Sequence, residues 1–165
     1  LIPSTRCDGY GTVVPLGCDY SMVPWFPRGG RSAHPSCESP FEPPTAVLDY
    51  RATYQDSCHL SNAQRVTDPP RQLLAAIPGI DLVELPGASL CCGAGGTYAI
   101  SERQFSVRIL TTKMNAVRET GADVIATANP GCVLQLQYGA QREELPIKVK
   151  YVTDLLDEAY SKELH

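Results

Sequence analysis

From about residue 45 onward, hydrophobic positions alternate between the two-residue spacing of strands and the three- and four-residue spacing of helices. Short apolar or alternating runs predict four strands, at 51–55, 82–85, 123–127 and 147–151. Helical spacing predicts four helices, at 68–77, 101–120, from 129 onward, and at 153–162. Strands that alternate with helices through short connections are typical of a parallel sheet with helices on both faces. We therefore expect an α/β, Rossmann-like fold of about four strands over residues 45–165.

Polar residues and glycines mark the expected ends of these helices. Asp68 is predicted to be an N-cap, and Ser101 with Gln104 reads as a capping box for the longest helix. Gly121 is predicted to end that helix. In the last helix four residues are expected to face inward: Leu155, Leu156, Ala159 and Tyr160.

Residues 1–44 form a different kind of sequence. They hold most of the chain's 14 prolines, several glycines and no sustained periodicity, which predicts an irregular or disordered segment or a truncated start. Cys7, Cys18 and Cys37 lie there without the close pair that metal sites usually contain, so we expect them to be unligated. The predicted division is 1–44, irregular, and 45–165, the folded domain.

Charge and composition exclude several classes of function. A net charge of -4 gives no attraction to nucleic acid or to an anionic membrane. No run of eighteen apolar residues predicts a membrane span, and no secretory leader is recognisable. Seven cysteines in 165 residues, without glycosylation sequons, favour metal-binding or redox thiols in a reducing compartment over a disulfide scaffold. We therefore expect a cytoplasmic protein.

Four cysteines follow three of the predicted strands. Cys58 follows the first, Cys91 and Cys92 the second, and Cys132 the third. Loops after the carboxyl ends of parallel strands meet at one edge of a sheet, where ligands bind. A single cysteine is often only a small buried hydrophobe. Four in these loops predict a metal site.

The surrounding residues support thiolate chemistry but also have simpler structural explanations. Cys132 lies in the first turn of a helix, where backbone N–H groups favour negative charge. Two adjacent cysteines can both act as ligands more easily in a multi-iron cluster than around one tetrahedral ion. This favours a cluster, but zinc stays open as an alternative. Six residues are expected around the ligands, although each also suits a turn or a helix cap: Asp56, His59, Gly93, Gly95, Gly96 and Asn129.

Three blocks in order, residues 54–60, 90–93 and 127–132, resemble the cysteine-rich CCG domain. This domain occurs in heterodisulfide reductases and in iron–sulfur subunits of glycolate oxidase, lactate-utilisation and anaerobic glycerol-3-phosphate dehydrogenase systems. The sequence is most similar to the C-terminal repeat of the glycolate oxidase iron–sulfur subunit. The family's last block contains C-x-x-C, whereas Asn129 stands at the first of those two positions here. The family's five-thiolate noncubane cluster is therefore put in doubt.

The resemblance implies an electron-transfer domain in a multi-subunit 2-hydroxy-acid dehydrogenase. It implies that Cys58, Cys91, Cys92 and Cys132 hold a 4Fe–4S cluster, with zinc as the alternative metal. Implied partners are a flavin-containing dehydrogenase subunit and further iron–sulfur subunits, peripheral to the inner face of the membrane. No nucleophile–base arrangement suggests catalysis by this chain alone. Two other functions stay open: a zinc-stabilised docking module, and a heterodisulfide-reductase-like thiol redox protein using Cys91 and Cys92.

Overall fold

A computed structural model describes residues 6–7, 13–14 and 41–164. The chain divides into two units, Leu1–Glu42 and Pro43–His165. In the first unit, β1 (Arg6–Cys7) and β2 (Val13–Val14) pair antiparallel. Most of the segment expected to be irregular lies outside the described residues.

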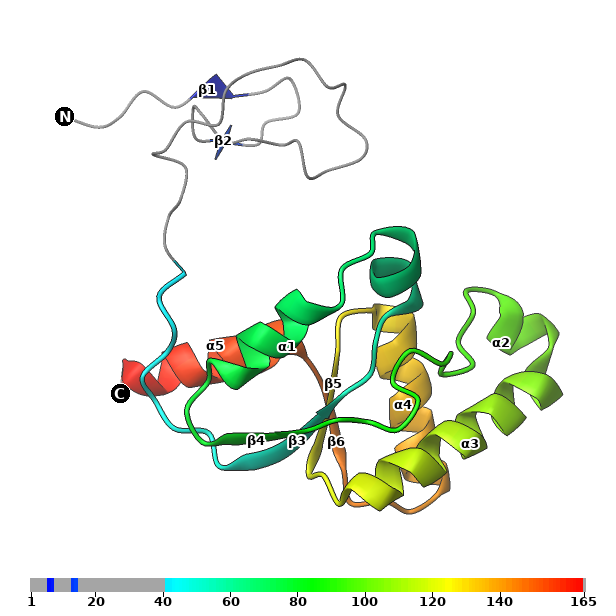
Figure 1. Ribbon diagram of the computed structural model, residues 1–165. Helices are drawn as coiled ribbons and strands as arrows, with labels where there is room; N and C mark the ends of the chain where they lie inside the picture. Colours follow the sequence, from blue (N-terminus) through cyan, green and yellow to red (C-terminus); the bar gives the residue numbers. More distant parts are fainter. Residues whose placement is uncertain (1–5, 8–12, 15–40, 165) are drawn as a thin grey trace. The chain divides into compact units, whose positions relative to one another are not determined.

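The second unit is built on a four-stranded, all-parallel sheet (Figure 1). In spatial order the strands are β4 (Ile80–Val83), β3 (Tyr50–Tyr54), β5 (Val124–Thr127) and β6 (Lys148–Tyr151). The predicted parallel α/β fold is confirmed. The order reverses direction between β3 and β5, and such a switch point is where open α/β sheets commonly bind ligands.

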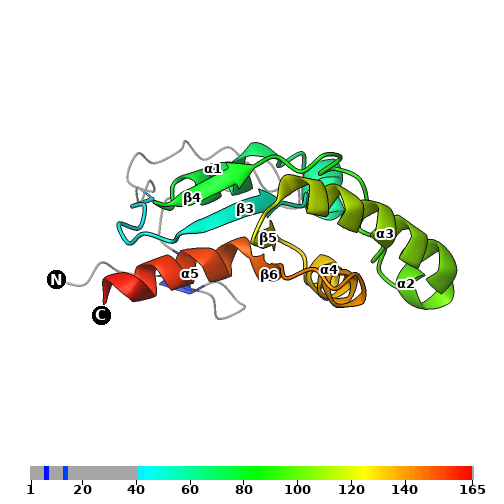
Figure 2. The same ribbon diagram turned by 90° about the horizontal axis from the view of Figure 1, so that it is seen from below.

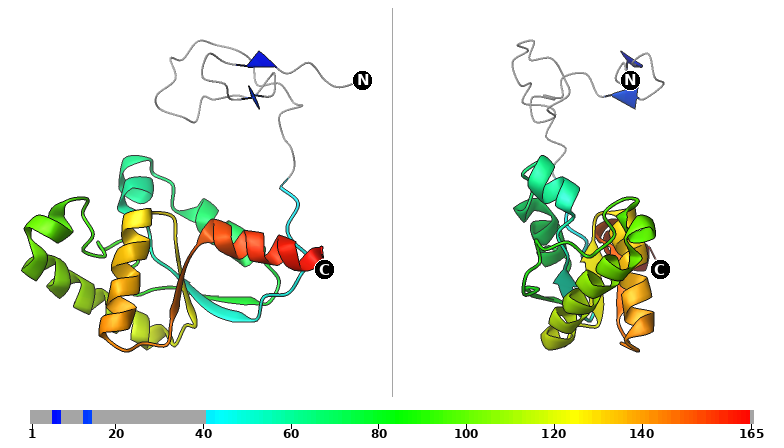
Figure 3. Two further views of the ribbon diagram at one scale, coloured as in Figure 1. Left: turned by 180° about the vertical axis from the view of Figure 1, so that it is seen from behind. Right: turned by 90° about the vertical axis from the view of Figure 1, so that its right-hand side faces the viewer.

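Two pairs of helices cover the sheet, and Figures 1 to 3 show the pairs well separated. On one face α1 (Asp68–Ala75) packs against α5 (Val152–Glu163). On the other, α3 (Arg103–Thr120) packs against α4 (Pro130–Arg142), with the short α2 (Tyr98–Ser101) leading into α3. A single π-helical turn, η2 (His59–Ala63), follows β3.

Alternate strand residues supply two separate cores. Val124 and Ala126 of β5 pack in the core beneath α1 and α5, and Ile125 packs in the core beneath α3 and α4. All three are fully buried, because in a parallel sheet both faces of a central strand are covered. The second core contains Cys92 and Cys132 beside Leu110. Cys92 and Cys132 therefore pack as part of the core between the sheet, α3 and α4. We call the edge of the sheet that carries Cys58, Cys91, Cys92 and Cys132 the thiol edge.

Several local expectations are wrong by one or a few residues. The N-cap of α1 is Thr67, because Asp68 already has helical geometry at the first position. The Ser101–Gln104 capping box is absent, since Ser101 ends α2 and the non-helical Glu102 (φ -122, ψ 48) separates α2 from α3. Tyr160, expected to face inward, is 36% exposed.

Other expectations are confirmed. Gly121 ends α3 in the left-handed conformation at φ 61. The second predicted strand is also present, but with different bounds: β4 covers Ile80–Val83 instead of 82–85, and Leu85 packs into the core just beyond its end.

The packing of α3 gives a first prediction. Leu110→Ala should lower the free energy of unfolding by about 2–5 kcal/mol, because Leu110 is 1% exposed and its loss leaves a cavity. Ile109→Ala, on the exposed side of the same helix, should cost less than about 1 kcal/mol. Urea unfolding followed by circular dichroism measures both. Equal losses would contradict the assigned core face.

Candidate metal centre

The loops that follow β3, β4 and β5 bring the four predicted ligands to one edge of the sheet. Cys92 and Cys132 are 2% and 5% exposed, whereas Cys58 and Cys91 are exposed to solvent. The thiols of Cys92 and Cys132 hydrogen-bond to each other, and Cys132 lies within electrostatic range of the other two. Across 41–164, however, no three His, Cys, Asp or Glu side chains lie close enough to bind one metal ion. The edge therefore has one tight buried pair and two outer thiols.

The pKa values of Cys92 and Cys132 are shifted in opposite directions. The hydrogen bond from Cys132 is the main cause that lowers the pKa of Cys92 to about 6, helped by the backbone N–H of Ala94 and the charge of Lys113 against the effect of burial. The hydrogen bond to Cys92 and then burial raise the pKa of Cys132 above its ordinary value. Of the two thiols, Cys92 is therefore the one whose ionised form the surroundings favour.

Cys132 is positioned by the start of α4. The Asn129 side chain is the N-cap, and its Oδ1 accepts a hydrogen bond from the Cys132 backbone N–H at 3.2 Å. The expected capping role of Asn129 is confirmed. The cap fixes the first helical turn and therefore the direction from which the Cys132 sulfur approaches Cys92.

The glycine run after Cys92 lets the backbone turn towards the thiols. Gly93 has φ +92 and its N–H donates to Cys91 Sγ over 3.3 Å. A Cβ at Gly93 would lie 2.5 Å from the carbonyl oxygen of Ser106. Ser106 Oγ in turn donates to the Gly93 carbonyl at 2.7 Å. Of the three glycines predicted near the ligands, Gly93 has this direct contact with a thiol; Gly95 and Gly96 form the following turn at φ +49 and +62.

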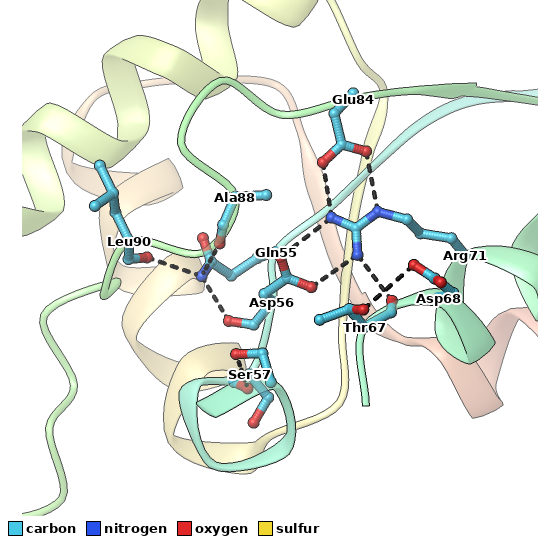
Figure 4. Close-up of polar contacts among 10 residues, drawn as sticks. Gln55, Asp56, Ser57, Thr67, Asp68, Arg71, Glu84, Ala88 and Leu90 are labelled. Carbon is cyan, nitrogen blue, oxygen red and sulfur yellow. Dashed lines mark hydrogen bonds and ion pairs between the residues drawn. The ribbon is translucent and has the colours of Figure 1, made fainter. Parts of the chain in front are cut away.

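Gln55 joins the loop of Cys58 to the loop of Cys91 (Figure 4). Its Nε2 lies 2.8 Å from the Asp56 carbonyl, 2.9 Å from the Ala88 carbonyl and 3.1 Å from the Leu90 carbonyl. The side chain is only 1% exposed, and its Oε1 is buried without a partner. The Gln55 amide therefore connects these two loops, at the cost of leaving its own Oε1 without a hydrogen-bond partner.

Asp56 belongs to a buried ion pair and not to the thiol group. Both of its oxygens accept from Arg71, at 2.8 and 3.1 Å, and Arg71 also binds Glu84 (Figure 4). Asp56, expected beside the ligands or in a turn of its loop, thus has both side-chain oxygens bound by the guanidinium. Hydrogen bonds to Glu84 and Asp56 raise the pKa of Arg71. His59, the other predicted neighbour, is exposed on η2.

Three site residues were not found from the sequence alone. Gln55 and Arg71 lie in segments that read as a strand end and a polar helix face. Lys113 lies on the core face of α3, is 4% exposed, and donates from Nζ to the Gly87 carbonyl at 2.6 Å. Lys113 could have been found from its spacing in the sequence. It lies three residues after Leu110 and four before Val117, so that a charged residue occupies a position on the apolar face of the helix.

The doubly covered parallel sheet and the thiols at its switch point define a cysteine-rich α/β domain. Residues 52–137 match the CCG family model, described as "Cysteine-rich domain", and the chain belongs to this family. The resemblance inferred from the three sequence blocks is thereby confirmed.

Curated relatives agree with this assignment. The chain is 50% identical over 109 residues to the "Probable glycolate oxidase iron-sulfur subunit" of Bacillus subtilis (strain 168), covering 65% of this chain and 24% of that protein. It is 37% identical over 112 residues to "Lactate utilization protein A" of Lysinibacillus sphaericus, covering 68% of this chain and 49% of that protein. The chain thus spans between a quarter and a half of the length of these relatives.

The ion pair of Asp56 gives a second prediction. Arg71→Met should lower the free energy of unfolding by about 2–4 kcal/mol at neutral pH, because it leaves the buried Asp56 charge unpaired. Arg118→Met is the control, since Arg118 is half-exposed and 3.9 Å from Glu143, and should cost about 0–1 kcal/mol. Chemical denaturation of both variants provides the measurement, and a loss for Arg71→Met no larger than the control's would refute the role given to the pair.

Gly93 gives a third prediction. Gly93→Ala should lower the free energy of unfolding by about 2–5 kcal/mol, from the positive φ together with the collision with Ser106. Gly96→Ala should cost only about 1–2 kcal/mol, because its Cβ would meet open space at φ +62. Thermal and urea unfolding compare the two, and similar costs would show that the Gly93–Ser106 approach is not rigid.

Proposed function

We propose that this chain is an iron–sulfur electron-transfer domain in which Cys58, Cys91, Cys92 and Cys132 hold a 4Fe–4S cluster. The observation that supports the proposal is that four cysteines lie in the segments directly after β3, β4 and β5, at the switch point of the sheet, with Cys92 hydrogen-bonded to Cys132. When bound, such a cluster would accept and release single electrons.

The donor set fits this group better than it fits a hard metal ion. All four candidate ligands are sulfur, and the nearby carboxylate of Asp56 is taken by Arg71. Soft thiolates favour iron–sulfur clusters or zinc. A single zinc ion needs its sulfurs within about 2.3 Å of one point, whereas a multi-iron cluster spreads its thiolates over several metal atoms. A tight pair with two outer thiols suits the second arrangement more closely.

The chain's own residues would orient the ligands and adjust their charge. Asn129 holds the turn that bears Cys132, and Gln55 holds the loops of Cys58 and Cys91 at a fixed separation. The Gly93 N–H already directs a hydrogen bond to the Cys91 sulfur, and such bonds adjust the potential of a cluster. The Cys92 thiol in turn hydrogen-bonds to Cys132, which links the β4 loop to the first turn of α4.

In the larger assembly, the domain would pass electrons from a flavin-containing subunit that oxidises a 2-hydroxy acid such as glycolate or lactate. This part of the proposal rests on the names of the relatives, a glycolate oxidase iron–sulfur subunit and lactate utilization proteins. Other iron–sulfur subunits and a membrane acceptor would complete the path. Within the described residues, none of the helices combines the length and apolar character needed to cross a bilayer.

The central test is metal identity in protein prepared without oxygen. We expect iron and acid-labile sulfide in about equal amounts, with visible absorption that dithionite bleaches. Cys132→Ser should remove most of the iron, whereas Cys18→Ser, outside the proposed ligand set, should retain it. Stoichiometric zinc without iron would support the docking module instead. Equal iron loss in both variants would refute the assignment of the ligands.

A further inference from the structure

Lys113 is a buried lysine that lies outside the proposed ligand set. It is 4% exposed on α3, among Leu110, Met114 and Val117 of the same core face. Its Nζ donates a 2.6 Å hydrogen bond to the carbonyl oxygen of Gly87, in the loop that carries Cys91 and Cys92. Burying an ammonium is unfavourable unless negative charge compensates it, so a lysine here calls for an anionic neighbour.

The ionisable groups around Lys113 are mostly thiols. Burial lowers the pKa of Lys113, and four groups oppose that effect through their charge, in the order Cys92, Cys91, Asp56 and Cys132. Asp56 already binds Arg71 through both oxygens, and Arg71 balances its charge. Asp56 is thus already paired with a cation, whereas the three cysteines of this set are proposed ligands and would be thiolates with a metal bound.

The helix geometry keeps this charge at a fixed place. Lys113 lies one turn from Leu110 and next to Met114, and both of these pack in the same core as Cys92 and Cys132. The hydrogen bond to Gly87 then fixes the end of the side chain beside the β4 loop. A charge held this way, in a medium of low dielectric constant, acts more strongly on its neighbours than a mobile surface lysine does.

We propose that Lys113 is the built-in countercharge of the thiolate site and raises the reduction potential of the cluster bound there. This inference rests on the proposed function. Lys113 acts through space and is not a ligand. A positive charge beside a cluster favours the state that has gained an electron, so removing the charge should make reduction less favourable.

The experiment compares three variants of the whole chain, each reconstituted anaerobically with iron and sulfide. Lys113→Met removes the charge with little change in length, and Lys113→Arg keeps the charge. Lys162→Met removes an exposed charge from α5, on the opposite face of the sheet. Redox titration followed by visible absorption gives each midpoint potential, and urea unfolding of the metal-free proteins reports the fold.

We expect Lys113→Met to lower the equilibrium constant for reduction at least tenfold, which is about 59 mV for a one-electron couple. Lys113→Arg and Lys162→Met should stay close to the unsubstituted protein. The metal-free Lys113→Met variant should fold at least as stably as the parent, since it replaces a buried charge by an apolar side chain of similar size.

Each other result is decisive. An unchanged potential in Lys113→Met, or an equal fall in Lys113→Arg, would overturn the inference and leave the proposed function standing. A Lys113→Met variant that does not fold would show a structural role and overturn it as well. Absence of iron from the unsubstituted protein would overturn the proposed function, and the countercharge with it.

Discussion

The side-chain amide of Gln55 holds together the two loops on which the thiol edge depends. β3 and β4 end side by side, but their loops diverge afterwards, one into η2 and the other towards α2. Three carbonyl contacts from one buried NH₂ group keep them in register at the point where Cys58 and Cys91 begin to separate. The unpaired Oε1 shows that this connection is made at a local cost, which is characteristic of sites where position matters more than stability.

Two cations serve two different sets of anions around this edge. Arg71 lies over the ring of Tyr54 and binds two carboxylates, so its charge is used within the scaffold. Lys113 approaches from the opposite face, and its Nζ donates to the Gly87 carbonyl; among the described residues it forms no ion pair with a carboxylate. The sheet thus separates a charge that stabilises the loop from the charge that we propose acts on the cluster. Exchanging the two side chains would not be conservative, because the planar guanidinium suits paired oxygens and the ammonium suits a confined point.

The sequence was sufficient for the architecture because each element had its own periodicity. The apolar run of β5, the helix cap at Asn129 and the glycine at 121 all produced the expected local structure. The placement of the four cysteines in segments that follow β3, β4 and β5 could be predicted from the parallel topology alone. The capping box at Ser101 failed because a short helix ends there, and the chain must turn at Glu102 before α3 can begin.

The residues missed were those whose importance lies in long-range contacts. Gln55 is bonded to carbonyls 33 and 35 positions away, and Lys113 to one 26 positions away. The sequence around a polar residue at a strand end, or around a single lysine in a helix, does not indicate such distant hydrogen-bond partners. Only the burial of Lys113 on a helical core face could have been anticipated, because a charge at that spacing breaks the apolar pattern.

The neighbouring position of β3 and β5 has a consequence for how the domain is made. The two strands are adjacent in the sheet, yet α1, β4, α2 and α3 intervene between them along the chain. Their pairing closes a long loop, and contacts of this kind form late in folding because chain entropy opposes them. In a growing polypeptide Cys58 and Cys92 therefore emerge well before Cys132, and the edge of the sheet that carries all four cysteines forms only when the sheet is complete. Insertion of the proposed cluster would then start from a folded domain, with the two solvent-facing sulfurs as the point of entry.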